Sequence, residues 1–232
     1  MEKKINILLT NDDGYTSKGL QILKKQLKGV GNIYVFAPIE AMSGKGCAST
    51  FFSGITFKKI DEFVYAVNGT PADCVSFGVF YLKKYFNIEI DLVISGCNAG
   101  SNITYDTLYS GTIGACIDAS KYRIPSIAFS APDDFRFVEE YCLEVYEYIV
   151  KNRLISQDCI VSVNFPYSNK IDGIKMATLY KRNDKHYFVE KDGKFYAKRE
   201  DEKDVPEGTD CYYVDHSNYI CITLLNNSLS KN

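Results

Sequence analysis

The chain has 232 residues and is 46% hydrophobic, enough for one large domain with a sizeable core. Its formal net charge of −2 gives no case for an electrostatically driven nucleic-acid binder. The eight cysteines form no Cys-x-x-Cys pair, which argues against zinc-ribbon and thioredoxin-like proteins. Because we find no apolar signal segment and no membrane-length apolar run, we expect a soluble, cytoplasmic protein with reduced, mostly buried thiols.

The first predicted element is an apolar run from Ile5 that ends in two adjacent carboxylates, Asp12 and Asp13, followed by Gly14. The run predicts a strand buried on both faces, as in a parallel sheet, with the carboxylates at its carboxyl end. Adjacent carboxylates repel each other, and a cation offsets that repulsion. We therefore interpret Asp12 and Asp13 as metal ligands. A solvated turn is the alternative, because Asn, Asp and Gly are common turn residues.

An alternating pattern of helices and strands follows. Residues 17–27 place apolar side chains on one helical face, and residues 32–38 read as a second buried strand. This opening indicates a right-handed parallel unit, and the whole pattern predicts an α/β fold with a doubly wound sheet. The later predicted elements are two short strands within 57–67, a helix over 71–85 with Thr70 as its N-cap, a strand over 90–95, a helix within 107–122, a strand over 125–130, a helix over 138–150 and a strand over 159–164.

The last quarter of the chain changes character. Residues 175–203 are charged, aromatic and roughly alternating, and Asp192-Gly193 separates two strand-like arms. This pattern predicts a projecting β-hairpin arm, interpreted as an oligomer contact. Residues 209–225 return to apolar strand patterning. Because no repeat or linker interrupts the chain, we expect residues 1–232 to form a single domain that carries this arm.

Two further oxygen ligands follow predicted strands. Ser43 lies in the loop after the second strand, and Asn98 lies in the polar cluster after strand 90–95. Together with Asp12 and Asp13 they form a set of hard oxygen ligands, which suits Mg²⁺ or Mn²⁺ rather than Zn²⁺. The carboxyl ends of parallel strands are also where open α/β sheets bind ligands.

A possible anion cradle lies at the start of the helix within 107–122. Ser110, Gly111 and Thr112 supply backbone amides, two hydroxyls and the positive end of a helix dipole. An ordinary N-cap is the alternative. Beside a metal, such a cradle fits metal-assisted hydrolysis of a phosphate ester. Tyr105 and Tyr109 could stack on a base or equally serve packing.

Other phosphatase chemistries lack their required residues. A cysteine-nucleophile phosphatase needs five residues between Cys and Arg, whereas Cys116 and Arg123 have six between them. A phosphoaspartate enzyme needs Asp-x-Asp after the first strand, and here Asn11 takes the nucleophile's place before Asp13. Neither a GxxxxGK[ST] loop nor a GxGxxG motif after the first strand is present, which weakens a dinucleotide-binding interpretation.

Taken in order, several segments resemble the SurE (survival protein E) nucleotidases over nearly the whole chain. No single segment is decisive, but their order and spacing together are very specific. The matching segments are residues 8–14 (LLTNDDG), 37–38 with 43–44 (AP and SG), 68–75 (NGTPADCV), 95–102 (SGCNAGSN), 109–112 (YSGT) and 163–166 (VNFP).

The resemblance implies a Rossmann-like three-layer core with a mainly parallel sheet and a hairpin arm. It implies a phosphomonoesterase for nucleoside 5′- and 3′-monophosphates, often active on short polyphosphate, with one Mg²⁺ or Mn²⁺ per subunit. It also implies assembly as a homodimer or homotetramer. We expect this assembly to form through the arm and the C-terminal region, and the charge balance and lack of apolar runs lead us to expect no nucleic-acid or membrane partner. By position, the resemblance assigns metal ligation to Asp12, Asp13, Ser43 and Asn98, and phosphate binding to Asn102, Ser110, Gly111 and Thr112. We expect Asp12 and Asp13 to be the catalytic residues as well.

Some alternatives stay open at this point. The chain departs from the family's usual glycine at Thr104 and from its usual Glu-Gly at Asp118-Ala119, which puts loop shapes in doubt rather than the activity class. Asp13 is our candidate for orienting or deprotonating the attacking water, and direct carboxylate attack is the alternative. A non-catalytic nucleotide or metal sensor and a sugar-phosphate hydrolase are the rival functions.

Overall fold

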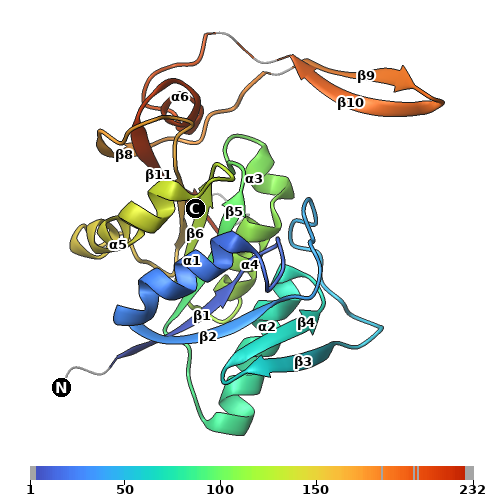
Figure 1. The fold of residues 1–232 in the computed structure, drawn as a ribbon, viewed down its shortest axis with the longest axis vertical. Helices are drawn as coiled ribbons and strands as arrows, with labels where there is room; N and C mark the ends of the chain where they lie inside the picture. Colours follow the sequence, from blue (N-terminus) through green and yellow to red (C-terminus); the bar gives the residue numbers. More distant parts are fainter. Residues whose placement is uncertain (1–3, 184, 201, 203, 228–232) are drawn as a thin grey trace.

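A computed structural model describes residues 4–183, 185–200, 202 and 204–227. The described part is built on a nine-stranded sheet of order β3-β4-β2-β1-β5-β6-β7-β11-β8 (Figure 1). Its strands are β1 (Ile5–Thr10), β2 (Gly31–Pro38), β3 (Thr56–Asp61), β4 (Val64–Asn68), β5 (Leu92–Ala99), β6 (Ser126–Ala131), β7 (Cys159–Asn164), β8 (Gly173–Ala177) and β11 (Tyr219–Asn226). The helices are α1 (Lys18–Gln26), the 3₁₀ turn η1 (Leu27–Gly29), α2 (Pro71–Phe86), α3 (Asp106–Tyr109), α4 (Gly111–Ser120), α5 (Arg136–Lys151) and α6 (Asp210–His216).

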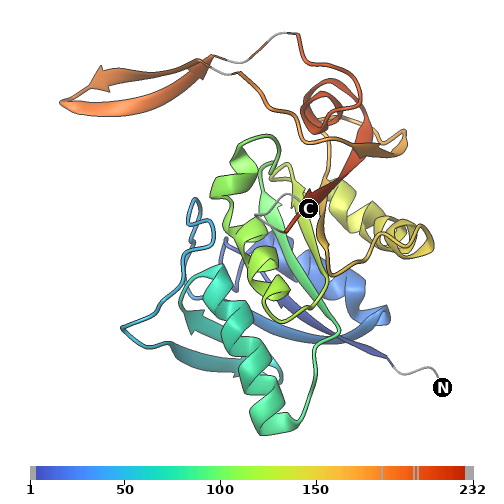
Figure 2. The ribbon, with the colours of Figure 1, turned by 180° about the vertical axis from the view of Figure 1, so that it is seen from behind.

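Helices cover both faces of the sheet, which gives three layers (Figures 1 and 2). On one face, Leu23 of α1 and Val145 of α5 share a buried apolar cluster with Leu9 of β1. On the other face, Val75 of α2 packs in a second cluster with Leu8 of β1. Neighbouring residues of β1 thus point into two different cores, which confirms the prediction of a strand buried on both faces.

The sheet is mainly parallel, as predicted. Strands β4, β2, β1, β5, β6 and β7 run parallel, while β3 is antiparallel to β4 and β11 is antiparallel to β7. The chain builds outward from β1 to β2 and β4, and then returns to the other side of β1 with β5. The strand order therefore reverses at the neighbouring strands β1 and β5. Doubly wound sheets bind ligands beyond the carboxyl ends of the strands at such a point.

Strand β5 is longer than predicted. It runs through the polar cluster to Ala99 rather than ending at Ser95, and its pairing with β6 shifts register between Ser95 and Asn98. Beyond the shift, Asn98 pairs with Ser130 of β6. Such irregularities re-aim side chains at sheet ends, and this one lies just before the candidate metal ligand Asn98.

The helix predicted within 107–122 is two helices, α3 and α4. Ser110 separates them with extended backbone angles (φ −67°, ψ 124°), and its hydroxyl oxygen accepts the Ile113 N–H at 3.1 Å. Ser110 is therefore the N-cap of α4. The capping prediction for α2 is confirmed: the Thr70 hydroxyl accepts the Asp73 N–H, and the Asp73 carboxylate accepts the Thr70 N–H.

The predicted hairpin is present as β9 (Lys185–Lys191) and β10 (Lys194–Glu200), an antiparallel pair that projects from the rest of the chain (Figures 1 and 2). It begins later than the predicted arm 175–203, because β8 pairs with β11 in the main sheet. The strand pattern expected over 209–225 also misses α6, whose N-cap Thr209 accepts the Tyr212 N–H at 3.3 Å. Positions 1–3, 184, 201, 203 and 228–232 of the expected domain lie outside the described residues.

The eight cysteines are all free thiols. Only Cys47 is exposed and Cys159 partly buried, so the expectation of mostly buried thiols is confirmed. Within the part of the chain that the structure describes, no helix is long and apolar enough to span a bilayer.

Candidate active site

A cavity of about 200 Å³ lies at the carboxyl ends of β1 and β5. Four separate stretches of chain meet there: the ends of the two strands, the loop after β2 and the segment that leads into α4. The residues that line it are Asp12, Ser43, Gly44, Asn98, Ala99, Asn102, Asp106, Tyr109 and Ser110. Five of the eight predicted site residues therefore share one cavity, although they are far apart in the sequence.

Asp12 is almost fully buried, with 3% of its surface exposed. Its Oδ1 accepts the hydroxyl of Thr112 at 2.6 Å. Burial raises the pKa of the Asp12 carboxyl, and the hydrogen bonds from the Thr112 side chain and from the backbone of Thr112 and Gly111 lower it in part. The amino end of α4 therefore points at this carboxylate, which favours its charged form.

Asp13 is only partly buried and does not line the cavity. Its Oδ2 accepts the backbone N–H of Ala99 at 3.1 Å, which joins the end of β1 to the end of β5. Burial raises the pKa of Asp13, the Ala99 hydrogen bond lowers it, and the negative charges of Asp12 and Asp133 raise it further. The negative charge of Asp12 thus acts on Asp13 in the direction expected for adjacent carboxylates, and a bound cation would offset it.

The remaining two predicted ligands are positioned by backbone contacts. The Asn98 amide nitrogen donates to the Gly100 carbonyl at 2.8 Å, which leaves the amide oxygen as the atom that can ligate a cation. The loop that carries Ser43 is fixed beside the acidic pair, because the Met42 N–H donates to the Asp12 carbonyl at 2.7 Å. Ser43 and Asn98 are distant from Asp12 in the sequence, and the fold brings them to the same cavity.

These oxygens fit a hard divalent cation. Two carboxylates, an amide oxygen and a hydroxyl are ligands that Mg²⁺ and Mn²⁺ accept, with water completing the shell. Among the described residues, no group of three or more His, Cys, Asp and Glu side chains gathers as a metal site. The donor set therefore matches a site of two acids with neutral oxygens, and it does not match a zinc site rich in His or Cys.

The four predicted phosphate residues occupy two different environments. Asn102 and Ser110 line the cavity. Gly111 and Thr112 lie behind it, buried against Asp12, and the Thr112 hydroxyl is directed at the Asp12 carboxylate. Asn102 is itself held in place by its neighbours, since its N–H donates to Asn164 Oδ1 at 2.8 Å.

Asp106 also lines the cavity, although no sequence pattern selects it as a site residue. It is the first residue of the short helix α3, where an acidic residue is an ordinary finding. Its partners lie far away in the sequence, so no local motif marks it. Tyr109, considered as a base-stacking residue, lines the cavity too, with its ring largely exposed.

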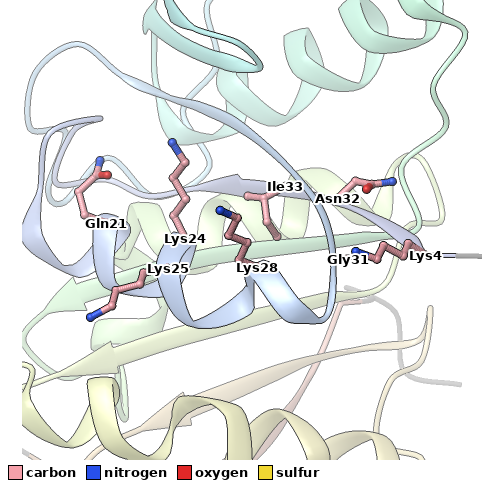
Figure 3. A pocket seen from close by; sticks show the side chains of 8 residues that line it. All are labelled: Lys4, Gln21, Lys24, Lys25, Lys28, Gly31, Asn32 and Ile33. Carbon is pink, nitrogen blue, oxygen red and sulfur yellow. The ribbon is translucent and has the colours of Figure 1, made fainter.

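A larger hollow of about 570 Å³ lies at the other end of the sheet, near the amino ends of β1 and β2. Figure 3 shows that the amino groups of Lys24, Lys25 and Lys28 there point in different directions. Lys25 forms an ion pair with Glu139 at 2.9 Å. Lysines near the end of α1 complement the helix dipole, and none of the predicted site residues lines this hollow.

The fold and site together define a Rossmann-like α/β protein with a cavity lined by carboxylate, amide and hydroxyl groups beside a helix amino end, at the point where the strand order reverses. The model of the family "Survival protein SurE" matches residues 7–186. The chain belongs to the SurE family.

Similar proteins agree with this assignment. The chain is 33% identical to "5′-nucleotidase SurE" of Clostridium botulinum (strain Loch Maree / Type A3), over 98% of this chain and 95% of that protein. It is 36% identical to "5′-nucleotidase SurE" of Aquifex aeolicus (strain VF5), over 97% of this chain and 93% of that protein. The crystal structure of the SurE protein from Aquifex aeolicus superposes with a TM-score of 0.84 at 34% identity, covering 97% of this chain and 95% of that one.

Proposed function

We propose that this protein is a divalent-metal-dependent phosphomonoesterase that hydrolyses nucleoside 5′- and 3′-monophosphates, with further activity on short polyphosphate. The observation that carries the proposal is the cavity that gathers Asp12, Ser43 and Asn98 with Asn102 and Ser110. The names of the two relatives, both 5′-nucleotidases, support the nucleotide as substrate.

In this proposal, Asp12, Asp13, Ser43 and Asn98 hold one Mg²⁺ or Mn²⁺ per subunit. When bound, the cation would polarise a phosphoryl oxygen and lower the pKa of a bound water. The hydrogen bonds from Thr112 and the amino end of α4 favour the charged form of Asp12 against its burial and orient the carboxylate for this task. The Ala99 N–H does the same for Asp13.

The phosphate would dock in the cavity against Asn102 and Ser110. The Ser110 hydroxyl accepts from Ile113, so its proton is directed elsewhere and can be donated to a phosphate oxygen. We assign Asp13 the role of orienting or deprotonating the attacking water. It lies beside the cavity rather than in its wall, with one carboxylate oxygen held by Ala99. Water would then attack phosphorus in line with the leaving nucleoside oxygen.

The test is phosphate release from a panel of nucleoside monophosphates, short polyphosphate and sugar phosphates, with EDTA followed by defined Mg²⁺ or Mn²⁺. Asp12→Asn and Asp13→Asn should each lower kcat/KM by at least about 100-fold, because each removes a charged oxygen ligand. Asp61→Asn, on exposed strand β3, is the matched control and should retain full activity. Near-normal turnover in both site variants with excess metal would contradict the assignment.

The same panel separates the rival functions. Nucleotide binding without phosphate release would indicate a sensor, and release from sugar phosphates alone would indicate a different substrate class.

We further propose a cytoplasmic homodimer or homotetramer assembled through the hairpin arm and the C-terminal region. The free thiols support the reducing compartment.

A further inference from the structure

Asp106 connects the cavity to the segment that caps α4. Its carboxylate belongs to a residue of the cavity wall, and its backbone carbonyl accepts the N–H of Ser110 at 3.1 Å. Ser110 is the N-cap of α4 and a proposed phosphate contact. A shift of Asp106 would therefore be transmitted directly to the residue that we expect to hold the phosphate.

The Asp106 side chain is held by the base of the hairpin arm. Arg199 of β10 places Nη1 at 3.4 Å from Asp106 Oδ2, and Arg182, before β9, places Nη2 at 4.0 Å from the same oxygen. Arg182 is buried, with 5% of its surface exposed. The hydroxyl of Tyr180 donates to Glu202 at 3.0 Å and joins the two chain segments that enter the arm. We call Tyr180, Arg182, Arg199 and Glu202 the arm root.

The ion pairs of Asp106 with Arg182 and Arg199 affect the charge of the cavity. Asp12 and Asp106 are acidic, and the described residues that line the cavity include no lysine or arginine. A carboxylate in the wall of a phosphate cavity would repel the substrate dianion unless cations offset its charge. Arg182 and Arg199 supply that offset from the arm root, behind Asp106.

A second tether joins the same two regions. The buried Asp210 carboxylate accepts the Thr104 N–H at 2.7 Å and the Tyr180 N–H at 2.8 Å. Thr104 lies between Asn102 of the cavity and Asp106, and Tyr180 belongs to the arm root. Asp210 therefore fixes where the arm begins relative to the site, and Asp106 carries the contact into the cavity wall.

We propose that Asp106 is a positioning residue that couples the hairpin arm to phosphate binding, through its ion pairs with Arg199 and Arg182. The inference rests on the proposed phosphatase function for its substrate. It predicts that the arm, although it projects from the sheet in Figure 1, influences affinity for the phosphate group more than the rate of the chemical step.

Kinetics of Arg199→Gln test the coupling. KM for the preferred nucleotide should rise about five-fold with kcat within about two-fold, the size expected for a partly exposed ion pair. Lys198→Gln is the matched control: the same charge is lost from the adjacent position of β10, whose side chain faces the opposite side. In an Asp106→Asn background, Arg199→Gln should cause no further rise in KM. Additive effects, or an equal rise in the control, would overturn the proposal.

Hydrogen exchange gives a readout that does not require turnover. Coupling is reciprocal, so inorganic phosphate with Mg²⁺ or Mn²⁺ should slow amide exchange in β10 of the wild type and not in Arg199→Gln. If the wild type releases no phosphate from nucleotides but shows this protection, the proposed function fails and the coupling stands. If an active wild type shows no change in β10, the coupling fails and the function stands.

Discussion

At the scale of single residues, the site depends on what holds Asp12. Thr112 is fully buried, and its hydroxyl donates to Asp12 Oδ1 at 2.6 Å. Thr112→Val keeps the shape and removes the donor, so we expect metal affinity or kcat/KM to fall about 10- to 100-fold. Thr112→Ser keeps the hydroxyl and should stay within a few-fold of the wild type. Metal titration of the activity measures both, and equal loss in the two variants would assign Thr112 to packing instead.

Position 111 requires a glycine because its backbone lies close against the side chain of Asp12. A Cβ at this position would lie 2.8 Å from the Asp12 Cβ and 3.0 Å from its Oδ2. Gly111→Ala should therefore displace Asp12, abolish most activity and cost about 1–3 kcal/mol in the free energy of unfolding. At Gly29 a Cβ meets nothing within 4 Å, so Gly29→Ala should change stability by less than about 0.5 kcal/mol. Chemical denaturation and phosphate release measure the two effects.

At the scale of elements, Asp210 joins α6 to the arm root and to Thr104, in the segment between β5 and α3. Its carboxylate accepts N–H groups of Thr104, Tyr180 and Cys211 at 2.7, 2.8 and 2.8 Å. Asp210→Asn turns one acceptor into a donor that faces a buried N–H, and we expect a loss of about 1–3 kcal/mol in the free energy of unfolding. Urea unfolding of the variant and the wild type checks this value.

The same carboxylate gives the wild type a predictable pH dependence. Burial raises the pKa of Asp210 above its ordinary value of 3.8, so the native state holds this proton more tightly than the unfolded state. This contribution to stability is fully present below 3.8 and is lost as the pH rises through the raised native pKa. The stability advantage of the wild type over Asp210→Asn should therefore grow as the pH falls from 7 toward about 4. Unfolding curves that keep a constant difference would contradict this account.

At the scale of the whole molecule, the hairpin arm leaves apolar surface uncovered. Phe188 and Phe195 are each 68% exposed, and an isolated two-stranded hairpin is only marginally stable in water. A second copy of the chain would cover these rings, so we expect the wild type to sediment as a dimer or tetramer. Phe188→Ser with Phe195→Ser should shift it to a smaller species, whereas Glu190→Gln should not. A monomeric wild type in analytical ultracentrifugation would refute this assembly.

Much of the fold was predictable because its signals are local. Thr70 and Asp73 cap α2 through contacts within one helical turn, and Asp192-Gly193 turns the hairpin through its own backbone preferences. The predicted boundaries of helices and strands are less accurate where contacts between distant parts of the chain override the local sequence pattern. The break at Ser110 divides one apolar helical pattern into two helices, and β8 lies in the main sheet only because β11 pairs with it.

The sequence by itself determined the α/β class, the acidic end of β1 and the choice of candidate oxygen ligands, because alternation, burial pattern and residue chemistry are properties of short segments. Only the tertiary structure decided that Thr112 faces Asp12 rather than the cavity. It also decided that Asp106 meets Arg199 across more than ninety positions of chain. Contacts of that kind are set by how the layers and the arm pack, and no short segment encodes them.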